Sequence, residues 1–236
     1  MADDVRTRYS KLLSRGEGTE RIQFFSDAVF AIAMTLLVLE IRVPDTDGDL
    51  RWEALGALWP QFFAYALSFT IIGLNWVTHH RKFLVIVRFD AMLMTINLAL
   101  LGFVALLPFP TSVLADYGDD TPVVVLYAFN VGIITVLQLA LWVHARRAGL
   151  TERLDDGVYR LVRRNLYPVP VIMGASIVVA FFSPLVAMWM WILIWPASIL
   201  VDRVGFRDSL DPATPKPAAP KPATPKPARR NRGSAS

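Results

Sequence analysis

The sequence has no cysteine, only three histidines and few charged residues. The lack of cysteine excludes disulfides, thiolate metal sites and cysteine nucleophiles within these 236 residues. Charged residues make up 19% of the sequence, whereas soluble domains carry about a quarter. Gly-x-Ser-x-Gly and HExxH motifs are also missing, and no apolar segment carries paired aspartates. The residues therefore favour no enzyme class, and we expect no metal site and no cofactor.

Hydrophobic residues, in contrast, make up 54% of the sequence and gather in long runs. Runs of about 20 apolar residues have the length needed to span the hydrocarbon core of a bilayer. The pattern predicts an all-α membrane protein with six transmembrane helices. The expected segments are residues 22–43, 54–80, 89–114, 121–145, 159–183 and 184–202.

The basic residues indicate how this bundle is oriented. Of the 24 Lys and Arg residues, 22 fall in the two terminal segments and in the second and fourth connections, and only Arg42 and Arg51 do not. Lys and Arg are retained on the cytoplasmic face, so both termini are predicted to be cytoplasmic. An odd number of spans would break this alternation. The placement of the charges also explains the net charge of +4 without any binding of nucleic acid.

The chain divides into three parts by composition. Residues 1–20 are polar, lack the apolar core of a signal peptide and are expected to form a cytoplasmic N-terminal segment. Residues 21–203 form the transmembrane domain. Residues 204–236 are rich in Pro, Ala and Lys, which predicts a disordered cytoplasmic tail, with a partner-docking tail as the alternative.

The first apolar segment is two-sided. An apolar stripe runs along one side at helical spacing, and Thr35 lies beside it. The stripe contains Phe25, Val29, Ile32, Leu36, Leu39 and Val43. One interpretation is a face toward lipid or the protein core. The other is a wall of an ion path, because hydrophobic constrictions gate some channels by dewetting. A single helix cannot enclose a path, but four copies around an axis could.

Asp27 lies within the first segment, where a carboxylate is costly unless it has a partner or water. The second segment returns to the same depth with His79, His80 and Arg81, and Ser26 and Arg21 precede Asp27. These groups can form a charge-assisted hydrogen-bond network. Its role is either a structural clamp between helices or a proton relay or gating latch. Adjacent helical histidines diverge by about 100°, so a metal site is not favoured here.

Specific motifs in these segments resemble a known family. Arg21-x-x-x-Phe25-Ser26-Asp27 opens the first segment and is followed by AVFAIAMTLLVLEI, which is similar to the signature of the transmembrane protein 175 family of potassium channels. Further matching motifs are Trp76-x-x-His79, Asn97-Leu98 and Leu107-Pro108-Phe109-Pro110. The resemblance covers about residues 20 to 200 and does not include the tail.

The resemblance implies a homotetramer whose first helix lines a central pore, without the TVGYG filter of ordinary potassium channels. By position, Ile32, Leu36 and Leu39 would be hydrophobic constrictions, and Thr35 would favour potassium. A structural network near the cytoplasmic end would contain Arg21, Phe25, Ser26, Asp27, Trp76 and His79.

These observations predict a passive cation channel with weak to moderate selectivity for potassium, in a bacterial-type plasma membrane. Its partners would be other copies of the chain, the lipid bilayer and potassium ions. Three alternatives stay open: a proton-permeable channel of the same architecture, an ion-coupled secondary transporter and a non-conducting scaffold.

Overall fold

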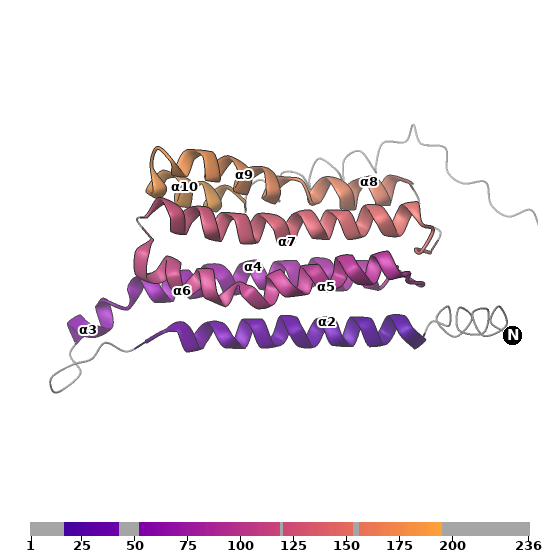
Figure 1. Cartoon of the computed structure of the whole chain (residues 1–236), viewed down its shortest axis with the longest axis horizontal. Helices are drawn as coiled ribbons and strands as arrows, with labels where there is room; N and C mark the ends of the chain where they lie inside the picture. The colour runs from indigo at the N-terminus through magenta and orange to yellow at the C-terminus, as the bar shows by residue number, and fades with distance from the viewer. Residues whose placement is uncertain (1–16, 43–51, 119, 153–155, 195–236) are drawn as a thin grey trace, which may run out of the picture.

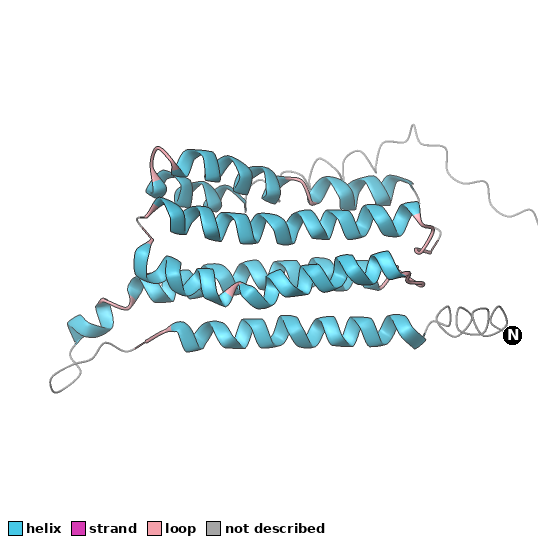
Figure 2. Ribbon diagram, viewed as in Figure 1, coloured by secondary structure: helices cyan, strands magenta, loops and turns pink. Residues whose placement is uncertain are grey.

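The computed structural model describes residues 17–42, 52–118, 120–152 and 156–194, and these residues are helical apart from short connections (Figures 1 and 2). Residues 1–16, which are most of the expected N-terminal segment, and the expected Pro-rich tail lie outside the described part. The helices, in chain order, are α2 (Glu17–Leu36), η1 (Leu37–Glu40), α3 (Trp52–Gly56), α4 (Trp59–Phe83), α5 (Ala91–Leu106), α6 (Pro108–Tyr117), α7 (Thr121–Arg147), α8 (Asp156–Asn165), α9 (Pro168–Ala180), α10 (Pro184–Met190) and η2 (Trp191–Leu193). The chain is an all-α membrane protein, as the sequence predicted.

Four stretches of the described residues are long and apolar enough to cross a bilayer. They are Thr19–Glu40, Ala54–Phe83, Ala91–Tyr117 and Thr121–Arg147, which correspond to the first four expected segments. The expected fifth segment, residues 159–183, is divided into α8 and α9, and the start of the sixth forms α10 and η2. Both of these regions give shorter helices, so the count of six spans remains a prediction.

Prolines explain several of the breaks between helices. A proline lacks the N–H group that an interior helical position uses, but the first turn of a helix does not need that group. Pro108, Pro168 and Pro184 are the first residues of α6, α9 and α10. Pro108 thus divides the third long stretch into α5 and α6, and α6 continues to Tyr117, three residues beyond the expected end of the segment at residue 114.

The helices are arranged in layers, and α7 lies at the centre. It packs against α9 on one side and against α5 and α6 on the other, while α2 packs against α4 and α5 along one edge (Figure 1). Of the most apolar 18 residues in Thr19–Glu40, 22% are buried, compared with 50% in Thr121–Arg147. In a single chain, α2 is thus much less covered than α7.

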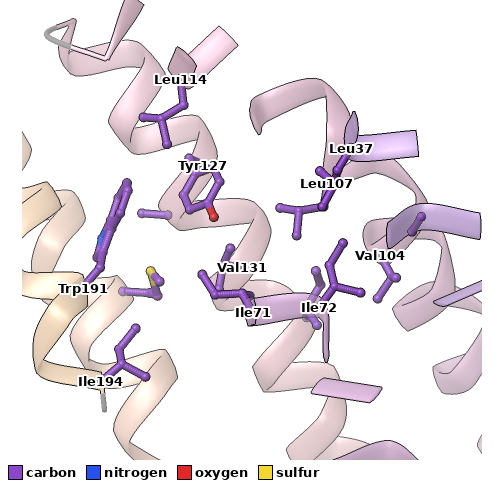
Figure 3. Packing of buried hydrophobic residues seen from close by; sticks show 14 of the residues in the cluster. Leu37, Ile71, Ile72, Val104, Leu107, Leu114, Tyr127, Val131, Trp191 and Ile194 are labelled. Carbon is purple, nitrogen blue, oxygen red and sulfur yellow. The ribbon is translucent and has the colours of Figure 1, made fainter. Parts of the chain in front are cut away.

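Close packing and polar contacts join the layers in the core (Figure 3). The ring of Tyr127 stacks on Trp191 with centroids 4.8 Å apart, and its hydroxyl lies 2.9 Å from Ser68 Oγ. Ser68 Oγ also lies 2.8 Å from Thr111 Oγ1. Lipid tails are as apolar as leucine, so van der Waals packing and interhelical hydrogen bonds hold such helices together. Ser68 connects α4, α6 and α7 in this way.

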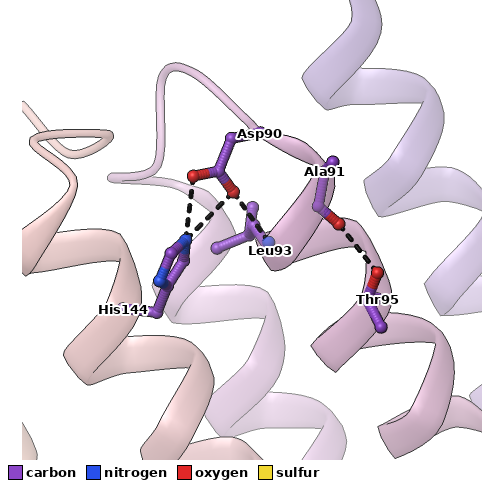
Figure 4. Close-up of polar contacts among 5 residues, drawn as sticks. All are labelled: Asp90, Ala91, Leu93, Thr95 and His144. Carbon is purple, nitrogen blue, oxygen red and sulfur yellow. Dashed lines mark hydrogen bonds and ion pairs between the residues drawn. The ribbon is translucent and has the colours of Figure 1, made fainter.

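The connections α4–α5 and α7–α8 are bound to each other. The N–H groups of Val87 and Arg88 both donate to the carbonyl of Leu150. Gly149, two residues after the end of α7 at Arg147, has a φ of 65°, which favours glycine. At the start of α5, His144 Nε2 lies 3.0 and 2.9 Å from the two oxygens of Asp90 (Figure 4). This end of the bundle is therefore fixed by contacts between α5 and α7.

Candidate functional site

Asp27 of α2 has its direct partner on α4. The indole Nε1–H of Trp76 donates a 2.8 Å hydrogen bond to Asp27 Oδ1. His80 Nδ1 lies 4.0 Å from Asp27 Oδ2 and accepts a 3.1 Å hydrogen bond from the amide of Gln23. The contact between Trp76 and Asp27 satisfies the carboxylate that the apolar environment of α2 makes costly.

A second polar contact joins α2, α4 and α5 in a chain of buried side chains. The Nε2 of His79 lies 2.8 Å from Asn97 Oδ1, which can only accept, so Nε2 donates. The amide of Asn97 donates a 3.0 Å hydrogen bond to Ser26 Oγ, and Ser26 donates to the carbonyl of Ile22 at 2.8 Å. Ser26, His79 and Asn97 are at most 3% exposed.

The structure brings together four of the six residues of the expected network: Ser26, Asp27, Trp76 and His79. Arg21 and Phe25 take no part in these hydrogen bonds and line a surface groove of about 380 Å³ between α2 and α5, which Asn97 also lines. Phe25 is 56% exposed, and the side chain of Arg21 makes no hydrogen bond or ion pair within the described residues. What the expected network omits is the central position of Asn97.

The burial of Lys82 is the largest difference between the sequence-based expectation and the structure among the polar residues. Its position beside Arg81 suggested a solvated basic connection, but it lies in the last turn of α4 and is 2% exposed. Its Nζ donates to the carbonyl of Gln138 at 3.0 Å and to Gln138 Oε1 at 2.6 Å. The side chain of Gln138 in turn donates to the carbonyl of Asn75 at 3.1 Å. A buried polar cluster therefore joins α4 to α7.

Much of the apolar stripe of α2 is uncovered in the single chain, although Val29 packs partly against the core and Val43 lies outside the described residues. Ile32, Leu36 and Leu39 are 57%, 40% and 68% exposed. The opposite side of the helix is packed against α4 and α5, and its residues Phe30, Ala33 and Leu37 are at most 1% exposed. The two sides of α2 therefore have different environments: one is bound to its own chain and the other is available to another molecule.

Thr35 lies on the uncovered side of α2, and its hydroxyl proton is donated within the helix. Its Oγ1 donates a 2.8 Å hydrogen bond to the carbonyl of Ile32 in the preceding turn. A hydroxyl has one proton and two lone pairs, so this contact leaves the oxygen lone pairs for another partner. Such an oxygen can interact with a cation but has no proton left to donate to an anion.

The helix changes its geometry after Leu36. Residues Leu37–Glu40 form a 3₁₀-helix, in which side chains three apart lie over one another. Leu36 and Leu39 line the same surface groove, of about 470 Å³, against α5 and α6. The change therefore keeps both leucines on one side at the end of the stripe.

No group of three or more His, Asp or Glu residues in the described ranges is placed to hold a metal ion.

Comparisons with known proteins match this chain to one family. The profile of the family described as endosomal/lysosomal potassium channel TMEM175 matches residues 21–108. A potassium channel of Streptomyces collinus is 46% identical over 150 residues, which are 61% of this chain and 73% of the relative. A potassium channel of Chamaesiphon minutus is 40% identical over 147 residues, 58% of this chain and 71% of the relative. The Homo sapiens protein named endosomal/lysosomal proton channel TMEM175 is 37% identical over 139 residues, which are 53% of this chain and 28% of the relative.

Solved structures show the same fold. The crystal structure of a lysosomal potassium-selective channel TMEM175 homolog from Chamaesiphon minutus has a TM-score of 0.64 and 30% identity, and the match covers 79% of this chain and 99% of that chain. A variant of the potassium channel MtTMEM175, in complex with a nanobody fusion, has a TM-score of 0.59 over 82% of this chain and 96% of that chain. At 22% identity, the second likeness bears on the fold alone.

Proposed function

Because this chain belongs to the TMEM175 family, whose members are ion channels and not enzymes, we propose that it is a potassium-selective cation channel. Conduction is passive, and potassium is preferred over sodium weakly to moderately. The uncovered stripe on α2 is the observation that carries this proposal. The proposed location is a bacterial-type plasma membrane, because the relatives from Streptomyces and Chamaesiphon come from bacteria.

The stripe forms a pore only when several copies assemble. One α2 helix cannot enclose a path, whereas four copies around an axis place four stripes toward each other. We therefore propose a homotetramer with α2 at its centre. The low burial of α2 in the single chain supports this assembly, because neighbouring copies would cover the uncovered side of the helix and its two grooves against α5 and α6.

Three rings of aliphatic side chains narrow the proposed pore, at Ile32, Leu36 and Leu39. Water leaves narrow apolar constrictions, so such rings oppose ion passage until they widen. Thr35 adds an oxygen between these levels, and its lone pairs are free because its proton is bound to the Ile32 carbonyl. Four such oxygens would replace part of the water around a cation, and potassium loses its water at a lower cost than sodium.

The polar contacts behind α2 hold the pore helix in place. Asp27 is bound to Trp76 on α4, and Ser26 is bound through Asn97 to His79. Both contacts lie on the side of α2 that faces its own chain, so they position the helix and do not touch the permeant ion. We therefore favour the structural clamp over the proton relay for this network.

Proton conduction is the second candidate function. The relatives from chicken, rat, mouse, human and cattle are named endosomal/lysosomal proton channels. A proton channel of this architecture would dissipate a pH gradient across liposomes when potassium is absent. A potassium channel that excludes protons would leave that gradient unchanged.

A planar-bilayer recording of the purified protein tests the main proposal. Under opposed potassium and sodium gradients, the reversal potential should lie nearer the potassium potential. Ile32→Asn should raise the conductance, because an amide makes the first of the three apolar rings easier to wet. Val178→Asn is the matched control, since Val178 is 61% exposed on α9 and lies outside the proposed pore. Absence of current, or equal conductance of the wild type and Ile32→Asn, would contradict the proposal.

A further inference from the structure

A second uncovered face of α2 lies beside the apolar stripe. Glu20, Phe24, Ala28 and Ala31 recur at spacings of three and four residues, and all four are exposed. Phe24 is the largest of them and is 68% exposed. The two alanines allow another helix to approach closely, as small residues do between membrane helices. These four residues are called the Phe24 flank below.

The groove between α2 and α5 lies on the other side of the stripe. Phe25 belongs to the stripe, and successive residues of a helix diverge by about 100°, so Phe24 and Ser26 lie on opposite sides of it. Ser26 is bonded to Asn97 of α5. The Phe24 flank therefore faces away from α5, and the stripe separates the flank from the groove.

The groove has the size and the lining to hold a phenyl ring. Its volume is about 380 Å³, and its lining includes Phe25, Met94 and Leu101. An apolar cavity of about 150 Å³ is already large enough for benzene. Phe25 and Met94 are 56% and 46% exposed in the single chain, so the groove is open to another molecule.

Opposite charges lie on the two faces at neighbouring positions of α2. Arg21 lines the groove, whereas Glu20 belongs to the Phe24 flank. Neither side chain makes a hydrogen bond or an ion pair within the described residues. A contact between a flank and a groove brings a carboxylate to a guanidinium. A twofold contact between two flanks would instead bring two copies of Glu20 together, which is unfavourable.

We propose that the Phe24 flank of one copy docks into the groove between α2 and α5 of the next copy, with the ring of Phe24 in the groove and Glu20 beside Arg21. This interface rests on the proposed assembly of α2 helices around a pore, and it adds which surfaces meet. The contact joins two different surfaces, and such heterologous contacts generate a ring when the rotation closes. Each copy then presents its flank to one neighbour and its groove to the other, while the stripe between them faces the shared axis.

Cross-linking of the full chain tests which surfaces meet, because the sequence contains no cysteine. The variant Phe24→Cys/Met94→Cys is treated with a short bis-maleimide in detergent. It should form a ladder of covalent products that extends beyond the dimer, since every copy offers both surfaces. Phe24→Cys alone should form no cross-linked product. Val178→Cys/Met94→Cys is the matched control and should remain a single chain, because Val178 is 61% exposed on α9, away from α2 (Figure 1).

Exchange of the two charges tests the proposed ion pair. Glu20→Arg and Arg21→Glu each bring like charges together across the interface and should reduce the share of oligomer measured by light scattering in detergent. The double variant Glu20→Arg/Arg21→Glu restores opposite charges and should recover the oligomer. A double variant with as little oligomer as Glu20→Arg alone would overturn the pairing of Glu20 with Arg21.

Truncation of Phe24 tests the contribution of its ring. Phe24→Ala should raise the dissociation constant of the oligomer about tenfold, because a few large side chains carry most of the energy of an interface. Phe182→Ala is the control, since Phe182 is 87% exposed between α9 and α10, and it should leave the constant unchanged. Equal dissociation constants for Phe24→Ala and the wild type would overturn the docking of this ring.

The possible failures of this interface and of the proposed channel can be told apart. Oligomers of Phe24→Cys/Met94→Cys that give no ladder, although both thiols react with a monofunctional maleimide, would overturn the interface and leave the proposed channel standing. Dimers cross-linked through Phe24→Cys alone would also overturn it, because two flanks would then meet. A wild type that stays a single chain at every concentration would contradict both the interface and the proposed pore.

Discussion

The indole of Trp76 donates a 2.8 Å hydrogen bond to the carboxylate of Asp27, which joins α4 to α2. The two residues are 49 positions apart in the chain. Asp27 lies on the side of α2 that faces its own chain, opposite the uncovered stripe. The same helix is thus fixed on one side and available on the other.

Removing the indole donor of Trp76 should weaken the packing of α2 against α4 and lower the stability of the fold. Trp76→Phe keeps most of the ring but leaves Asp27 without its indole partner, and hydrogen bonds to charged groups contribute about 1.5–3 kcal/mol. We expect a lower Tm of the purified protein in detergent. Trp59→Phe is the control, because Trp59 is 72% exposed at the start of α4. Equal Tm values for Trp76→Phe and the wild type would show that the contact does not stabilise the fold.

Asn97 should contribute more to the stability of the fold than Ser26, because it bonds to two residues on two other helices. Asn97→Leu leaves both Ser26 and His79 without their interhelical partner, and a buried unpaired polar group costs about 1–3 kcal/mol. We expect a larger fall in Tm than for Ser26→Ala, which removes one contact. Leu98→Ala, at a 64% exposed position on the same helix, serves as control. A Tm for Asn97→Leu above that of Ser26→Ala would count against this role.

Lys82 and Gln138 should behave as a coupled pair. Each single change, Lys82→Met or Gln138→Leu, leaves a buried polar group without its side-chain partner. The double variant removes both groups and should cost less than the sum of the single changes, with a coupling of about 0.5–3 kcal/mol. Unfolding in mixed micelles measures all four free energies of the cycle. Additive effects would mean that the 2.6 Å contact contributes nothing of its own.

Asp90 should make the fold sensitive to acid. Burial by itself would raise the pKa of Asp90, but hydrogen bonds from the Leu93 N–H group and from His144, together with the charge of His144, lower the pKa below its usual value. A carboxyl with a lower pKa in the folded state stabilises the fold at neutral pH, and this contribution is lost as the pH falls through the folded pKa. The wild type should therefore lose stability on acidification.

The variant Asp90→Asn isolates this effect, because asparagine still caps a helix but does not titrate. Its Tm should fall less than that of the wild type between about pH 7 and about pH 3. Parallel Tm curves for the two proteins over this range would exclude a contribution from Asp90.

Thr35→Val should reduce the preference for potassium. Valine has nearly the same shape as threonine but offers no oxygen to a cation, so the conductance should change less than the selectivity. The reversal potential under mixed potassium and sodium measures the selectivity directly. An unchanged reversal potential would remove Thr35 from the selectivity of the pore.

The sequence predicted the long helices because apolar length alone decides which segments can span a bilayer. It also identified the apolar stripe, since helical spacing places Ile32, Leu36 and Leu39 on one side. It did not predict the 3₁₀ segment at Leu37–Glu40, which has no distinct residue pattern. It also gave the third segment, 89–114, as one helix, whereas Pro108 starts a new helix within it.

The polar contacts were predicted only in part. Reasoning from charge paired Asp27 with the nearby histidines and Arg81, whereas its hydrogen bond comes from the neutral indole of Trp76. Only the family resemblance pointed to Trp76. The burial of Lys82 could not be seen either, because a lysine beside an arginine at a helix end usually reaches solvent. Its acceptor, Gln138, is 56 residues away in the chain.

The pore lining is the central claim, and the lack of cysteine makes it directly measurable. A single cysteine is introduced at Leu36 and, as a control, at Val178 on α9, and a charged thiol reagent is added during bilayer recording. If α2 lines the pore, the reagent should block the current of Leu36→Cys and leave the currents of Val178→Cys and the wild type unchanged. A current through Leu36→Cys that persists after the thiol has been shown to react would place the pore elsewhere.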